Sequence, residues 1–167
     1  MRVTVAACVA AIVGVAGVAG CSDRRPPVAG VGQWILGKTE LREAPGFCNP
    51  DAVTLCSNNG AVAIGDQAAS VSLYFAGPDP DAKLVEIELV VRSCDPEPLA
   101  RALIEKLGPP AVRRPPHLQW RSEGAFVAAQ VPESHRRCLV HFVAPTDRDR
   151  IAELTAEAGT TSSPSPR

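Results

Sequence analysis

The sequence predicts an α+β domain, in which a small antiparallel sheet of hairpins combines with a helix at about 96–107 and a C-terminal helix at about 147–158, cross-linked by disulfides. Two observations predict this class. Apolar and polar residues alternate over 70–75 and 83–92, which is the pattern of half-buried strands. The predicted strands also occur in runs that a helix interrupts, and this order favours α+β over a parallel βαβ sheet.

The first elements are expected to be short strands. Residues 32–41, which include Trp34, fit a short strand or turn. Segments 53–56 and 61–64 are predicted to pair as a hairpin, because the Asn59-Gly60 step between them tolerates positive φ and is a strong turn signal.

Two longer strands follow over 70–75 and 83–92, and the second has acidic residues on its outer face. In 83–92 the apolar residues Val85, Ile87, Leu89 and Val91 share one face, while Glu86 and Glu88 point to the other. These two glutamates are candidates for a catalytic carboxylate pair, but a solvated outer face is the ordinary explanation of such a pattern. We therefore predict that both glutamates lie in solvent.

The two helices are predicted from their boundary residues. Asp95 can cap the first helix with Pro96 at its first position, and Gly108 with the following prolines ends it. Thr146 and Asp149 fit a capping box at the start of the last helix. The residues expected to face inward are Leu99, Leu103, Ile104 and Leu107 in the first helix, and Ile151 and Leu154 in the second.

Between the helices the sequence predicts a proline-rich connection and more strands. Residues 112–116 form the connection. Segments 118–122 and 125–131 read as a hairpin that turns at Glu123-Gly124, and 138–143 as a further strand.

The N-terminal segment has the features of an export signal. Arg2 precedes an almost unbroken apolar stretch over 3–18, and the segment ends in Val18-Ala19-Gly20-Cys21. This ending resembles the lipobox of bacterial lipoproteins. The alternatives are a plain secretory signal peptide and an uncleaved membrane anchor, for which the stretch is barely long enough.

The resemblance implies a processed and acylated chain. Residues 1–20 would be a lipoprotein signal peptide, and Cys21 would carry a diacylglyceryl (palmitate-type) thioether as the new N-terminus. Residues 21–31 would then be a lipidated tether, in which Arg24 and Arg25 either attract anionic headgroups or are part of a soluble linker. The rest is expected to be one α+β domain over 32–158 and a disordered tail over 159–167.

With Cys8 in the signal and Cys21 acylated, four cysteines remain for an exported domain. An even number indicates two disulfides with three possible pairings. The strand positions favour Cys48–Cys56 across a small loop and Cys94–Cys138 at one end of the sheet. A zinc site is the rival, but the chain has no C-x-x-C pair, and no histidine lies near the first two cysteines.

Candidate functional residues are few. The chain has a net charge of −1, which gives no electrostatic case for nucleic acid. The chain has three histidines, His117, His135 and His141, and the last lies on a strand face where we expect it to be packed. No sequence motif predicts a cofactor or a metal. A surface patch for an acidic ligand, glycan or partner is the remaining candidate, formed by Arg113, Arg114, Trp120, Arg121, Arg136 and Arg137.

The sequence thus supports two hypotheses of function. The leading one is an envelope lipoprotein on the periplasmic or extracytoplasmic face of a membrane, held in the lipid bilayer by acylated Cys21. It would be a non-catalytic binding or scaffold module for another envelope protein or a cell-wall component. The alternative is an envelope hydrolase with a histidine-based site, which requires a histidine in a cleft beside an acid.

Overall fold

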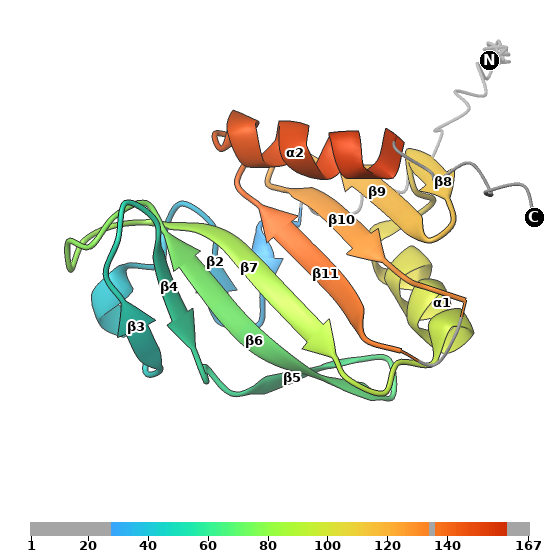
Figure 1. Ribbon diagram of the computed structural model, residues 1–167, viewed down its shortest axis with the longest axis horizontal. Helices are drawn as coiled ribbons and strands as arrows, with labels where there is room; N and C mark the ends of the chain where they lie inside the picture. Colours follow the sequence, from blue (N-terminus) through green and yellow to red (C-terminus); the bar gives the residue numbers. More distant parts are fainter. Residues whose placement is uncertain (1–27, 134–135, 160–167) are drawn as a thin grey trace, which may run out of the picture.

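The computed structural model describes residues 28–133 and 136–159. The predicted signal peptide 1–20, Cys21 with most of the tether, His135 and residues 160–167 of the predicted tail lie outside this range. The described residues form one large antiparallel sheet with a helix on each face (Figure 1). The predicted α+β class is confirmed.

The large sheet has the strand order β3-β4-β6-β7-β11-β10-β9-β8, with β5 also paired to β6. Its strands are β3 (Phe47–Asn49), β4 (Thr54–Ser57), β5 (Ala61–Ile64), β6 (Gln67–Phe75), β7 (Leu84–Val91), β8 (Val112–Arg114), β9 (His117–Arg121), β10 (Phe126–Gln130) and β11 (Cys138–Val143). The remaining elements are β1 (Gly30–Val31), β2 (Trp34–Ile35), the 3-10 turn η1 (Leu41–Glu43), α1 (Pro96–Leu107) and α2 (Arg148–Gly159).

The alternation in the strands determines which residues form the main core. Apolar residues of β6, β7, β11 and β10 face α1 and the β1–β2 hairpin, and together they make one continuous buried cluster. The segment placed in the tether contributes to it, because Val31 of β1 pairs with Trp34 and both are buried. The domain therefore begins before residue 32.

The predicted hairpin of 53–56 with 61–64 is wrong. Both strands pair with β6 instead, β4 along its C-terminal part and β5 along its N-terminal part. The Asn59 side chain explains the difference, since it hydrogen-bonds the backbone of Cys56 and Gly46 at 2.7 Å and 3.2 Å and holds β4 beside β3. The backbone φ at Gly60 is positive as expected, but the turn does not fold β5 back onto β4.

Helix α1 spans the predicted residues. Pro96 is its first residue, Leu99 and Leu103 are buried, and the N–H of Gly108 donates to the Ile104 carbonyl at the C-terminal end. Asp95 precedes the helix, but its side chain makes no capping hydrogen bond. The proline-rich connection after α1 contains an unexpected edge strand, β8, which pairs with β9.

Helix α2 lies on the opposite face of the sheet from α1 (Figure 1). Leu154 and Ile151 pack against Phe126, Ala128 and Val143, residues that alternate with those of the main core. The cap is not the predicted box of Thr146 and Asp149. Asp147 occupies that role, because its Oδ1 accepts a hydrogen bond of 3.2 Å from the Arg150 backbone N–H.

Both predicted disulfides are confirmed. Cys48–Cys56 joins directly paired residues of β3 and β4. Cys94–Cys138 links the segment after β7 to the first residue of β11, at one end of the sheet.

Candidate functional site

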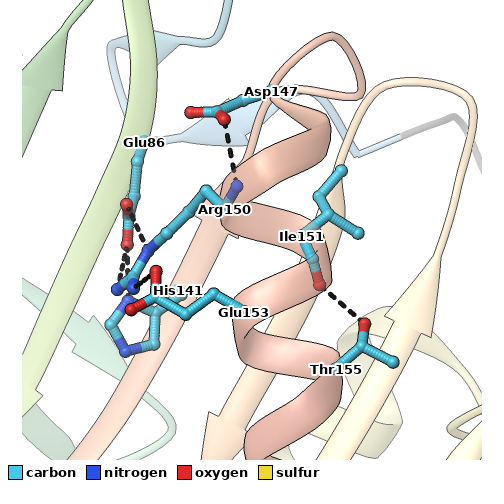
Figure 2. A network of polar contacts seen from close by, with 7 residues as sticks. All are labelled: Glu86, His141, Asp147, Arg150, Ile151, Glu153 and Thr155. Carbon is cyan, nitrogen blue, oxygen red and sulfur yellow. Dashed lines mark hydrogen bonds and ion pairs between the residues drawn. The ribbon is translucent and has the colours of Figure 1, made fainter.

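A buried network of charged side chains lies between the sheet and α2 (Figure 2). Glu86 of β7 is 4% exposed and His141 of β11 is 6% exposed. The Glu86 carboxylate accepts a hydrogen bond from His141 Nδ1 at 2.6 Å and two from Arg150, from Nε at 2.9 Å and from Nη2 at 3.2 Å. The prediction that Glu86 lies in solvent is wrong, because α2 returns across this face and covers it.

Arg150 is the residue of α2 that joins the network to solvent. Its Nη1 donates to Glu153 one turn further along the helix at 2.6 Å, and its side chain is a quarter exposed. The guanidinium therefore uses one edge for the buried carboxylate and another for a surface carboxylate. This bidentate geometry is the strong form of a charge-assisted hydrogen bond.

The electrostatics of the network favour an ionised Glu86. Burial acts to raise its pKa, but the hydrogen bonds from His141 and Arg150 and the positive charge of Arg150 outweigh burial, so its pKa is lowered. The same contacts, added to those with Glu153, raise the pKa of Arg150 against the opposing effect of burial. Since an ionised carboxylate is a pure acceptor, the proton of the His141–Glu86 bond belongs to Nδ1.

His141 also lines a cavity of about 420 Å³ on the outer face of the sheet, beside α2. Its Nε2 points away from Glu86 (Figure 2). The other polar side chains of the lining come from β7, β9, β10 and α2, and they are Glu88, His117, Gln119, Gln130, Arg150 and Glu157. None of the described lining residues carries a hydroxyl or a thiol.

A second cavity of about 580 Å³ adjoins the first, because Glu88 lines both. It extends over β6 and β7, and its polar lining residues are Ser57, Asn58, Ser70, Ser72, Glu88, Arg92 and Arg137. We name the two cavities together the outer groove. It occupies the part of the outer sheet face that α2 leaves uncovered.

Tyr74 borders the network on β6, where it pairs with Glu86. Burial and the nearby carboxylates of Glu88 and Glu86 raise the pKa of Tyr74 to about 12. Its phenol therefore stays protonated at neutral pH.

The structure does not bring the six predicted patch residues together. Trp120 is 5% exposed, and its Nε1 donates to the Gly108 carbonyl at 2.8 Å. Arg121 lies over the Phe126 ring at 5.1 Å on the α2 face, whereas Arg113 borders α1 on the other face.

Three patch residues remain. Arg114 is on the edge strand β8, opposite His117. The carbonyl of Arg136 accepts a hydrogen bond from the Cys94 N–H. Arg137 lines the outer groove and is the one patch residue in its lining.

Sequence reasoning missed Arg150 and the burial of Glu86. The pattern of β7 locates Glu86 on the outer face, but Arg150 is 64 residues away, and no local signal pairs them. Among the described residues, no group of three or more His, Cys, Asp or Glu side chains is arranged to hold a metal ion.

The fold and site together define a disulfide-linked α+β domain with a polar groove on one face of its sheet. Comparisons with known protein families, curated proteins and solved structures found no match for this chain. No helix within residues 28–133 and 136–159 is both long and apolar enough to cross a membrane.

Proposed function

We propose that this protein is a bacterial envelope lipoprotein, held on the extracytoplasmic side of a membrane by acylated Cys21, and that its domain is a binding module. The N-terminal pattern that ends in Val18-Ala19-Gly20-Cys21 supports the anchor. The two disulfides agree with an oxidising compartment outside the cytoplasm.

The observation that carries the binding role is the contrast between the two sheet faces. One face is packed by α1 and the β1–β2 hairpin into a continuous apolar core. The other face is only partly covered by α2 and presents the outer groove, whose lining is rich in hydrogen-bonding groups. A concave surface with several convergent polar groups is the usual form of a ligand site.

Val28 and the arginine end of the outer groove lie at opposite ends of the sheet. The Val28 carbonyl accepts a hydrogen bond of 3.2 Å from Ser122 Oγ, in the turn between β9 and β10. Arg137 precedes β11 at the opposite end of these strands, where Gln130 pairs with Leu139. Val28 is thus at one end of the sheet, and the arginine end of the outer groove is the far end.

The anchor and the groove need separate tests. Mass spectrometry of the N-terminal peptide from membrane fractions should show acylated Cys21, and Cys21→Ala should release the protein from membranes. To test the groove, a photo-crosslinking amino acid is placed at position 117, in the groove lining, in the full-length protein in cells, and the yield of crosslinked partners is measured. Its matched control is the same replacement at Arg101, which is exposed on α1. Equal crosslinking yields at the two positions would contradict a binding role for the groove.

A hydrolase with a histidine-based site is the second candidate, and one observation favours it. His141 is hydrogen-bonded to a buried acid and lines a cavity, which is the arrangement of an oriented general base. It would have to activate water, since no described residue of that lining carries a hydroxyl or a thiol. Hydrolysis of p-nitrophenyl acetate that disappears in a folded His141→Gln protein supports the hydrolase, and equal rates in both proteins contradict it.

A further inference from the structure

Two arginines meet at the far end of the outer groove. Val91 of β7 pairs with Cys138 of β11, so the next residues along these antiparallel strands, Arg92 and Arg137, come side by side at the end of the ladder. Both line the cavity of about 580 Å³. The Cys94–Cys138 disulfide, which is buried in the core, ties together the two chain segments that carry these arginines.

What sets Arg92 and Arg137 apart is their place side by side in the groove lining, since the absence of an ion pair is common to most described cations. Lys83 and Arg42 form ion pairs with Glu40, and Arg150 does so with Glu86 and Glu153. Within the described residues, neither Arg92 nor Arg137 forms an ion pair with a carboxylate. Like charges placed opposite each other on neighbouring strands repel, and an anion bound between them removes that repulsion.

The rest of the cavity determines what else the ligand must present. It is lined by Ser57, Asn58 and Ser72, whose hydroxyl and amide groups can hydrogen-bond both donors and acceptors of a ligand. Glu88, which pairs with Ser72 on one side and with His141 on the other, is a hydrogen-bond acceptor toward the middle of the outer groove. A simple anion would be repelled by Glu88, whereas a ligand with hydroxyl donors at that position would bond to it.

We propose that the outer groove binds an anionic saccharide. Its carboxylate or phosphate lies between Arg92 and Arg137, and its sugar hydroxyls donate to Glu88 and exchange hydrogen bonds with Ser72. The inference rests on the proposed binding function and names the ligand class for it. It also replaces the predicted patch of five arginines and Trp120 with a site that shares only Arg137 with it.

The test is calorimetric titration of the full-length protein, purified from membranes in detergent, with four probes. Glucuronic acid and glucose 1-phosphate carry both sugar and anion, glucose carries the sugar alone, and inorganic phosphate carries the anion alone. We expect at least one anionic sugar to bind about tenfold or more tightly than glucose and than phosphate. Comparison of the two anionic sugars tells whether a carboxylate or a phosphate is preferred.

Variants assign the binding to the site. Arg92→Gln and Arg137→Gln should each weaken binding of the anionic sugar about tenfold, and Arg101→Gln, which removes the same charge on α1, should leave it unchanged. Glu88→Gln should reduce the preference for the anionic sugar over phosphate, and it tests the site even if an arginine variant misfolds.

The proposal is overturned if neither anionic sugar binds more tightly than glucose, if phosphate alone binds as tightly, or if Arg101→Gln has the same effect as the groove variants. Crosslinking from His117 to an envelope component without binding of these sugars would reject the ligand class and leave the binding module standing. If position 117 crosslinks no more than position 101 and these sugars do not bind, both proposals fail.

Discussion

Replacing Glu86 by glutamine should destabilise the domain far more than an ordinary surface substitution. Glutamine keeps the size of the side chain but removes the charge that Arg150 and His141 face. Its amide also places an N–H group where the carboxylate had accepted hydrogen bonds from three N–H donors. At least one buried donor then loses its partner.

The magnitude follows from the contacts. Hydrogen bonds to charged groups contribute about 1.5–3 kcal/mol each, against about 1 kcal/mol for neutral ones, and breaking a fully buried ion pair costs about 3–5 kcal/mol. Because the Arg150 side chain is 25% exposed, the lower part of this range applies. We expect Glu86→Gln to lower the free energy of unfolding by about 3 kcal/mol, which is a decrease of roughly 10 °C in melting temperature.

The effect should depend on pH in a defined direction. The pKa of Glu86 is lowered below its ordinary value of 4.5, so its stabilisation is complete above pH 4.5. It is lost as the pH falls through the lowered folded-state value, where the carboxylate becomes protonated. Glutamine cannot titrate, so the stability difference between wild type and Glu86→Gln should shrink as the pH falls below 4.5. Urea unfolding at pH 7 and at several acidic values measures this difference.

Glu40→Gln is the matched control. The Glu40 carboxylate also contacts two cations, Lys83 and Arg42, and its pKa is lowered chiefly by the hydrogen bond from Lys83. These groups are at the surface, where solvent screens them, so the decrease in melting temperature should be several-fold smaller. A Glu86→Gln effect as small as that of Glu40→Gln, or one independent of pH, would refute our account of the buried network.

Two further predictions concern the covalent and backbone constraints. Replacing both cysteines of Cys94–Cys138 by alanine should lower the free energy of unfolding by about 4 kcal/mol, and replacing those of Cys48–Cys56 should lower it by about 2.5 kcal/mol. The difference arises because the bridges close loops with sequence separations of 44 and 8. Urea unfolding that reverses this order would contradict the loop-entropy account. Gly46→Ala should cost about 1–3 kcal/mol, because a Cβ there would overlap the Ser57 carbonyl oxygen between β3 and β4, and an unchanged unfolding midpoint would show that the strands move apart freely.

The sequence was sufficient for features that depend on local periodicity. Alternation predicted the two central strands, and Pro96 and Gly108 predicted the limits of α1. These limits require no knowledge of which distant segment lies on which face. The Cys94–Cys138 bridge needed one step more, the expectation that the end of one strand and the start of the other meet at the same end of an antiparallel sheet.

Some failures are local, as at the two helix caps, but those that affect the site involve contacts between distant segments. Asn59-Gly60 predicted a hairpin, but the nine-residue strand β6 is long enough to pair with β4 and β5 in turn. Glu86 was assigned to solvent because its strand alternates, and nothing in that alternation indicates that Arg150 will cover it. The two arginines of the outer groove are adjacent only because β7 and β11 are neighbours in the sheet.

The outer groove is therefore built in two parts that depend differently on α2. Arg150, Leu154 and Glu157 of α2 line the cavity at His141, whereas no described residue of α2 lines the cavity at Arg92. Helix α2 is held on the sheet by the apolar contacts of Ile151 and Leu154, by a buried hydrogen bond of 3.0 Å from Gln119 Nε2 to the Leu154 carbonyl, and by the Glu86–Arg150 contact. It follows that Glu86→Gln should loosen the cavity at His141 and leave the cavity at Arg92 and Arg137 intact. This one substitution, of a residue that does not contact the proposed ligand, therefore distinguishes the contributions of the two cavities to binding.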